Sequence, residues 1–446
     1  MKTNGPFHDD FREGAVSPIP PLPSNLDLQP LSRRPIRLSD ETIRQVLARP
    51  VPIWPGACLD RVLSPAGSLA SIIIVTHNNL PFTRMCVESV LASTDWPAME
   101  LIVVDNGSTD GTLQYLSELA IHVPLVRVIP AGKNLGFAAA NNLGFQESRG
   151  ELIVLLNNDT IVSEGWLRRL AAHLRDSTVG AVGPVTNRAC NEAQVPFSYR
   201  TCGEFAQFAN RRVADYAGRC CELPMLSMFC IAMRREVMRE IGPLDPQFEI
   251  GMFEDDDYSM RLRAAGKRLL CAEDCFIHHF GEASLGNMVA DGQFNRLFDA
   301  NRIRFERKWA VKWKPHSRRP EPAYDSMVAR VCEAIDQTVP PGSIALILNK
   351  GDPALVDVPS RTCRHFPADE HGNYSGHYPA DGSSVVAGIR RAKSSGGEFL
   401  VIPHTSSWWL DFYPELRAHL ETSASLAYSD SGSCLIYKLD NVICEA

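Results

Sequence analysis

From residue 68 onward, short runs of apolar residues alternate with amphipathic segments. The runs are rich in Ile, Val and Leu and span only a few residues, as expected of strands buried on both faces of a sheet. Strands alternating with helices at this spacing predict an α/β fold with a doubly wound, mostly parallel sheet. The predicted strands are 71–76, 100–104, 125–129 and 151–156, and the predicted helices are 82–93, 111–120 and 136–148.

After residue 157 the alternation becomes weaker. We expect irregular structure over 188–218, and regular elements on either side of it. The expected elements are strands at 180–184 and 228–233 and helices at 166–175, 235–241 and 255–265. A second alternation begins near residue 323 and predicts a smaller α/β domain. Its expected elements are strands at 344–348 and 399–403 and helices at 387–393 and 410–420.

These patterns divide the chain into four parts. A proline-rich N-terminal arm is expected to hold one short helix over 40–48, capped by Ser39 or Asp40. A large α/β domain, a basic proline-bearing linker and a small α/β domain of unknown role follow. The expected bounds are 1–67 for the arm, 68–315 for the large domain, 316–324 for the linker and 325–446 for the small domain.

Composition narrows the class of protein. The chain has 446 residues and a net charge of −7, which gives no reason to expect nucleic-acid binding. Its 13 cysteines include no C-x-x-C pair, which favours reduced thiols over a structural zinc site. The first residues lack the apolar core of a signal peptide, and no apolar run is long enough to span a bilayer. We therefore expect a cytoplasmic protein without a transmembrane segment, and leave open peripheral contact with the inner face of the membrane.

Polar side chains follow each of the buried strands. In open α/β sheets the carboxyl ends of the strands form the edge at which ligands bind. Asp159, which follows the apolar run 152–156, could hold a divalent cation there, and the cation could hold a diphosphate. Asp105 is placed to accept a hydrogen bond from a nucleoside base or a ribose hydroxyl, whereas Asp110 is more simply a helix cap.

Two further groups carry candidate chemistry. Four acidic residues, 254–257, precede a predicted helix. The positive end of the helix dipole accounts for one or two of them, and a carboxylate beside a cleft could serve as a general base. His278 and His279 follow an apolar stretch. A histidine is most often structural, but with a distant Asp it could complete a Mn²⁺ or Mg²⁺ site.

Six motifs in this order resemble the family 2 glycosyltransferases of the GT-A fold, and most closely the branch similar to bacterial rhamnosyltransferases. The ordered set covers roughly residues 68–315 and is far more specific than any one member. The motifs are VTHNN, LIVVDNGSTDGT, KNLGFAAANN, LIVLLNNDT, MFEDDDYSMRLRAAG and HHFGEAS. The region beyond 324 resembles a module appended to such transferases, with no known activity.

The resemblance implies roles for individual residues. It implies that the nucleotide is bound by Thr76, Asn78, Asp105, Asn134 and Asn158. It implies that the metal is bound by Asp159 and His279, with His278 as the second choice for the histidine. Asp255 would take the proton from the acceptor, and Glu254 would face the acceptor. Asn157 stands where the family more often has Asp, so Asp159 is the only charged ligand that this motif supplies.

The implied activity is inverting, metal-dependent transfer of a hexosyl or deoxyhexosyl group. The donor would be a nucleotide-diphosphate sugar, the acceptor a hydroxyl of a glycan or lipid-linked molecule, and the setting bacterial surface-polysaccharide biosynthesis. Two alternatives stay open. One is a catalytically weak scaffold that binds sugar nucleotides, which Asn157 favours. The other is a nucleotidyltransferase, although THNNLPFTR after the first strand is not a glycine-rich phosphate loop.

Overall fold

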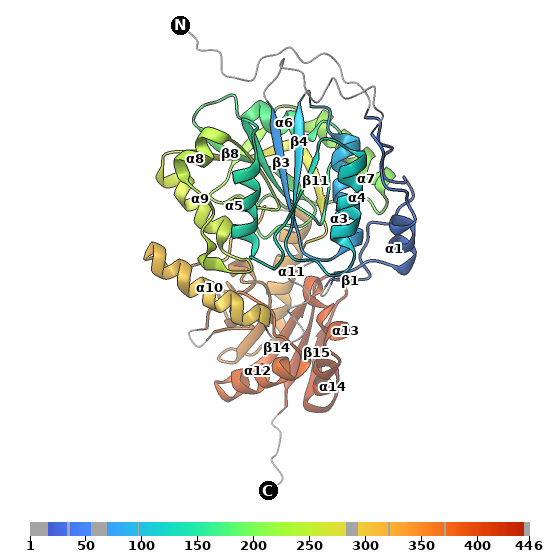
Figure 1. The fold of residues 1–446 in the computed structure, drawn as a ribbon. Helices are drawn as coiled ribbons and strands as arrows, with labels where there is room; N and C mark the ends of the chain where they lie inside the picture. Colours follow the sequence, from blue (N-terminus) through green and yellow to red (C-terminus); the bar gives the residue numbers. More distant parts are fainter. Residues whose placement is uncertain are drawn as a thin grey trace. The chain divides into compact units, whose positions relative to one another are not determined.

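The computed structural model describes residues 17–33, 36–54, 69–96, 98–281, 293–319, 322–369 and 372–440 (Figure 1). The chain divides into two compact units. The first comprises residues up to 287 together with 301–312 and 316–319, and the second comprises 288–300, 313–315 and 320–446. Among the described residues, no helix combines the length and the apolar character needed to cross a membrane.

In the described residues the first unit is built on a nine-stranded sheet with the order β5-β4-β3-β6-β10-β8-β11-β7, and β9 pairs with β11 outside this path. Neighbours from β5 to β6 are parallel, and β10 runs antiparallel to β6 and β8. The strands are β3 (Ala70–Thr76), β4 (Met99–Asp105), β5 (Val126–Pro130), β6 (Leu152–Asn157), β7 (Thr160–Ile161), β8 (Val179–Thr186), β9 (Cys220–Glu222), β10 (Cys230–Arg234) and β11 (Arg268–His279).

Helices cover both faces of this sheet. Ile72 and Ile74 pack on one face and Ile73 on the other, so every residue of the strand core is buried and the apolar run is continuous. One face carries α3 (Leu80–Ser93), α4 (Thr112–His122) and α6 (Trp166–His173). The other carries α5 (Phe137–Glu147), α7 (Cys202–Tyr216), α8 (Arg235–Ile241) and α9 (Glu254–Ala264). The predicted doubly wound α/β class is confirmed.

The expectation of irregular structure over 188–218 is wrong, because α7 lies within it. Thr201 and Glu204 form a capping box that starts the helix, and Phe205, Ala209 and Arg212 turn inward at helical spacing. The Thr-x-x-Glu signal was present in the sequence, but the polar residues around it hid the apolar stripe.

The structure describes part of the expected N-terminal arm, residues 17–33 and 36–54. The short helix expected there is confirmed as α1 (Asp40–Leu47), and Ser39 is its cap, accepting a hydrogen bond from the backbone N–H of Thr42. It follows a minimal hairpin of β1 (Ser32–Arg33) and β2 (Ile36–Arg37). Helix α10 (Gln293–Trp309) follows the strands of the first sheet in the chain.

The second unit contains a five-stranded sheet with the order β13-β12-β14-β16-β15. Its elements are α11 (Pro322–Thr338), β12 (Ile344–Leu348), β13 (Thr362–Phe366), α12 (Gly382–Ser394), β14 (Gly397–Pro403), α13 (Trp409–Phe412), α14 (Pro414–Ser423), β15 (Ala424–Ser429) and β16 (Cys434–Leu439). The single helix expected over 410–420 is wrong: it is divided in two, because Pro414 lacks the N–H that would continue α13. The smaller α/β domain is confirmed.

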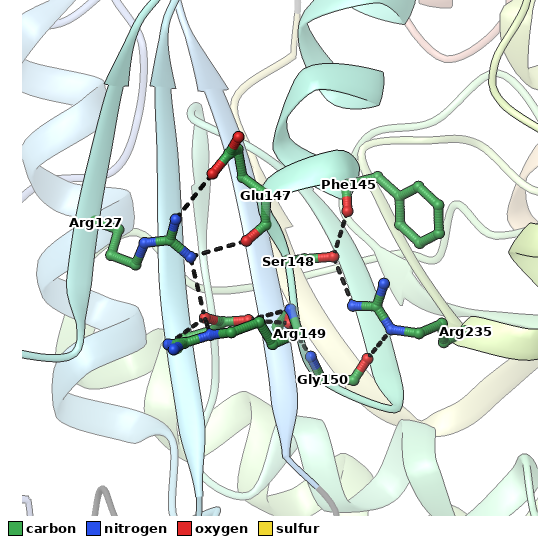
Figure 2. Close-up of polar contacts among 9 residues, drawn as sticks. Arg127, Phe145, Glu147, Ser148, Arg149, Gly150 and Arg235 are labelled. Carbon is green, nitrogen blue, oxygen red and sulfur yellow. Dashed lines mark hydrogen bonds and ion pairs between the residues drawn. The ribbon is translucent and has the colours of Figure 1, made fainter.

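A buried carboxylate fixes the turn from which β6 begins. Glu100 accepts hydrogen bonds from Ser71 Oγ (2.6 Å), from the Arg149 backbone N–H (2.6 Å) and from the Arg149 guanidinium (2.9 and 3.0 Å). On the other side of the turn, Arg235 donates to the carbonyl of Gly150 (Figure 2). Burial raises the pKa of Glu100, but the hydrogen bonds from Ser71 and Arg149 outweigh it, and the pKa lies below its ordinary value.

Replacing Glu100 with Gln should destabilise the first unit by about 2 kcal/mol at pH 7, because charge-assisted hydrogen bonds to a buried group are lost. The pKa of Glu100 is lowered in the folded state from 4.5. Its stabilisation is therefore present above that value and is lost as the pH falls through the folded-state pKa. Urea unfolding should therefore show a smaller difference in the free energy of unfolding between wild type and variant at pH 3 than at pH 7.

The matched control is Glu147→Gln. Glu147 pairs with Arg127 but is 48% exposed, so its loss should change stability by less than about 0.5 kcal/mol. Equal losses in the two variants would contradict the role assigned to Glu100.

Candidate functional site

The ends of β3 and β6 are joined by a buried polar cluster. The Nδ2 of Asn158 donates to the hydroxyls of Thr76 (3.2 Å) and Thr83 (3.0 Å), and the two hydroxyls are 2.7 Å apart. All three side chains are buried. Two residues that the resemblance assigned to the nucleotide are thus brought together, but their polar atoms bond to one another and form the floor of the sheet edge.

Asn78 and Asp105 organise the adjoining turn. The Asn78 N–H donates to Ser108 Oγ (2.8 Å), and its side-chain oxygen accepts from the Thr109 N–H (2.7 Å). Asp105 accepts from the Ser108 N–H through Oδ2 (3.3 Å), whereas its buried Oδ1 has no hydrogen-bond partner. A buried carboxylate oxygen without a donor is costly. Asp105 Oδ1 is therefore a buried acceptor with no donor among the described residues.

Asn106 connects this turn to the turn that carries Asn134, and the sequence analysis missed it. Its Nδ2 donates to Asn134 Oδ1 (3.0 Å), and its Oδ1 accepts from the Leu135 N–H (2.8 Å). The backbones touch as well, since a Cβ on Gly107 would lie 2.8 Å from the backbone of Lys133. Asn134 itself is exposed. The Asn-Gly dipeptide was the available signal for this close approach.

Asp159 and His279 face each other across the β7–β11 pairing, with Asp159 Oδ1 3.4 Å from His279 Nε2. His279 Nδ1 lies 3.0 Å from the carbonyl of Arg188. Because a carbonyl only accepts, Nδ1 carries a proton, and Nε2 is the ring nitrogen that lies beside the carboxylate. Nε2 has no hydrogen-bond partner. A backbone acceptor that fixes the tautomer in this way is typical of histidines that bind metals.

The remainder of a metal shell does not come from the described side chains, because no group of three or more His, Cys, Asp or Glu is gathered among them. The residues present fit Mn²⁺ or Mg²⁺ as one oxygen and one nitrogen ligand, with the other positions left to the substrate and water.

His278, the second choice as a metal ligand, has a structural role. Successive residues of a strand point to opposite faces, so it turns away from the side on which His279 lies. Its Nδ1 is 2.6 Å from the Tyr199 hydroxyl, and its ring packs edge-on against those of Tyr199 and Phe280. Burial lowers its pKa to about 3, so it is neutral.

The acidic run at the start of α9 divides into two pairs. Asp257 is buried and accepts from Trp309 Nε1 (2.9 Å) and from the Lys308 ammonium (2.6 Å). Asp256 Oδ1 is 3.0 Å from His316 Nε2. These two carboxylates are thus compensated by cationic or hydrogen-bonding partners from beyond residue 300.

Glu254 and Asp255 form the other pair. No described Lys, Arg or His forms an ion pair with either of them, and Glu254 Oε2 is buried without a hydrogen-bond partner. Burial and the charge of Asp255 raise the pKa of Glu254 to about 8. Burial and the charge of Asp256 raise the pKa of Asp255 to about 7. A carboxylate that titrates near neutral pH is well suited to act as a general base.

The loop before this run is held in an unusual backbone conformation. Met252 and Phe253 have φ of +78° and +74°. The buried Asn301 donates to the carbonyls of Phe248 and Gly251, both at 2.8 Å, and so holds the loop from inside. Non-glycine residues adopt such angles only where the surroundings impose them, commonly at functional sites. Nothing in the sequence marked Asn301, because its partners are about 50 residues away.

Residues 71–242 match the family model described as glycosyl transferase family 2. The O-antigen biosynthesis protein RfbC of Myxococcus xanthus is 27% identical over 267 residues, which are 55% of this chain and 20% of RfbC. The glycosyltransferase AglE of Haloferax volcanii is 26% identical over 252 residues, 54% of this chain and 78% of AglE.

Among solved structures, GalNAc-T7 with UDP, GalNAc and Mn²⁺ aligns with a TM-score of 0.42 and 18% identity, over 63% of this chain and 61% of that one. The chain spans less than a third of the length of two of the curated relatives that it matches, 29% of one and 20% of the other.

Gly136 should tolerate no side chain, because it joins the Asn134 turn to the loop before the acidic run. A Cβ there would lie 1.9 Å from the carbonyl oxygen of Glu249. Gly132→Ala is the matched control, since Gly132 also has a positive φ (+74° against +83°) but nothing within 4 Å. Denaturant unfolding should show a cost of about 1 kcal/mol for Gly132→Ala, from backbone strain alone. Gly136→Ala should cost at least about 2 kcal/mol more. Similar costs would contradict the close contact.

Proposed function

We propose that the glycosyl transferase family 2 domain of this chain moves a sugar from a nucleotide-diphosphate donor to a hydroxyl of a glycan or lipid-linked acceptor. The observation that carries the proposal is the division of the acidic run. Asp257 is paired with Lys308 and Asp256 with His316, whereas Glu254 and Asp255 are half-buried and form no ion pair with a described Lys, Arg or His. Burial and neighbouring carboxylates raise the pKa of both residues. A nucleotide-binding domain alone has no need for such a pair.

In the proposed reaction Asp255 takes the proton from the acceptor hydroxyl. The acceptor oxygen attacks the anomeric carbon, the bond from that carbon to the diphosphate oxygen breaks, and the nucleotide leaves with the bonding electrons. Base and leaving group lie on opposite sides of the sugar, so one displacement inverts the anomeric centre. Glu254 Oε2 accepts a further hydrogen bond from the acceptor. Holding the two substrates in line supplies much of the acceleration.

Asp159 and His279 would hold the divalent cation, Mn²⁺ or Mg²⁺. When bound, the cation offsets the negative charge that develops on the departing diphosphate. The fixed tautomer of His279 and its unpartnered Nε2 beside Asp159 support this assignment. The buried Oδ1 of Asp105 supports its role at the nucleoside, together with Asn134 on the neighbouring turn.

The biological setting is also part of the proposal. RfbC is named for O-antigen biosynthesis, which supports a role in bacterial surface-polysaccharide assembly. We place the reaction in the cytoplasm or at the inner face of the membrane. Screening UDP-, GDP- and dTDP-sugars for thermal stabilisation of the protein would identify the donor, because a ligand that binds only the folded state raises its stability.

Asp255→Asn should abolish transfer while leaving nucleotide binding intact. Loss of a general base is expected to lower kcat by about 10²- to 10⁴-fold. Product formation and the Kd for the donor nucleotide, from calorimetry, are the two measurements. Asp215→Asn, an exposed position on α7, is the control and should behave like the wild type. Near-normal turnover in Asp255→Asn would exclude the base assignment.

Chelation by EDTA should stop transfer, and Asp159→Asn and His279→Ala should each weaken Mn²⁺ binding by about 10- to 100-fold, since each removes one ligand. Electron paramagnetic resonance of Mn²⁺ titrations in the presence of the nucleotide reads binding directly, without relying on activity. His122→Gln serves as the control histidine variant. Full transfer in excess EDTA would overturn the assigned cofactor.

A further inference from the structure

His316 lies far from the acidic run in the sequence, yet it contacts this run in the structure. It belongs to the same compact unit as α9. Its Nε2 is 3.0 Å from Asp256 Oδ1, and the two side chains are only 16% and 14% exposed. The contact joins two groups 60 positions apart in the sequence and shields them together from water.

The segment that carries His316 is anchored firmly to the sheet. Arg319, three residues later, pairs with both carboxylate oxygens of Glu273 on β11 and also donates to the carbonyl of Glu192. Glu273 in turn accepts from Arg212 of α7 at 2.6 Å. His316 is therefore held beside Asp256 by a second, independent ion-pair cluster.

The charges that act most strongly on His316 are negative. Asp256 is its direct partner, and Asp255 and Glu192 act on it at longer range. Burial lowers the pKa of His316, but these carboxylates outweigh it, and the pKa is raised above its ordinary value. The imidazolium in turn lowers the pKa of Asp255, against burial and Asp256, which raise it.

We propose that His316 is a positioning residue for the base: in its protonated form it binds Asp256 and keeps Asp255 ionised at neutral pH. This inference rests on the proposed function and adds to the site a residue from the segment that follows α10. Without the cation, the charge of Asp256 would stand uncompensated beside Asp255 and would favour the protonated, inactive base.

No neighbouring cation of the described residues is placed to substitute for His316. Lys308 pairs with Asp257 and Asp245. Arg261 lies 3.8 Å from Asp257, and Arg319 is paired with Glu273. The charge of His316 is thus matched to Asp256, the carboxylate that follows the base in the chain.

The test is the pH dependence of kcat/KM, whose acidic limb reports the base of the free enzyme. In His316→Gln this limb should move upward by about one pH unit. Activity at pH 6.5 should fall by about tenfold relative to wild type, with the two enzymes converging near pH 9, where the histidine is neutral in any case. His316→Arg keeps the cation and should keep the wild-type limb. The exposed histidine variant His404→Gln is the control.

A second comparison separates this effect from simple packing. In an Asp256→Asn background no charge needs compensation, so adding His316→Gln should leave the acidic limb unmoved. A purely structural role would instead lower activity by the same factor at every pH and in both backgrounds. Either that result, or an unchanged limb in His316→Gln, would overturn the inference.

An independent readout covers the case in which no donor gives transfer. The imidazole of His316, assigned by its loss in His316→Gln, should titrate in NMR spectra above the ordinary pKa and fall on Asp256→Asn. If that shift is seen without any transfer activity, the proposed function fails while the pairing stands. A titration unaffected by Asp256→Asn would reject the pairing itself.

Discussion

The constraint on which the rest depends is that the central strands of the first sheet are buried on both faces. A strand such as β3, with Ile72, Ile73 and Ile74 fully enclosed, has no room for polar chemistry along its length. Every functional group must therefore emerge where a strand ends, or arrive from a loop or helix that reaches the same edge. The buried cluster of Thr76, Thr83 and Asn158 reflects this arrangement, since these polar side chains at the edge bond to one another.

The fold could be predicted because its main signal is local. Continuous apolar runs and helical periodicity located β3, β4, β5 and β6 within a few residues, and the order of these elements implied a doubly wound sheet. Helix α7 was missed because its inward stripe, Phe205, Ala209 and Arg212, is short and interrupted by polar residues. The two-residue strand β7 and the three-residue strand β9 form only because they pair with β11. No local sequence pattern predicts this pairing.

The site was predictable to the extent that residues stand at strand or helix ends. The sequence placed Asp159 and His279 in one site on resemblance alone, and the structure shows them facing each other. The sequence could not show which of the four acidic residues are paired, because their partners lie 50 to 60 positions away in the chain. Only the folded chain brings Trp309 and Lys308 to Asp257 and His316 to Asp256, and no ion pair between described residues reaches Glu254 or Asp255.

The order of these groups along the chain has a consequence for synthesis. The strand ends from Thr76 to Asp159 leave the ribosome first, whereas Asp255, His279 and His316 follow much later. Strand β11 can join the sheet only after its last residue, His279, has been made, and the anchored segment ends at Arg319. The candidate site is therefore completed only by the parts of the chain that are made last.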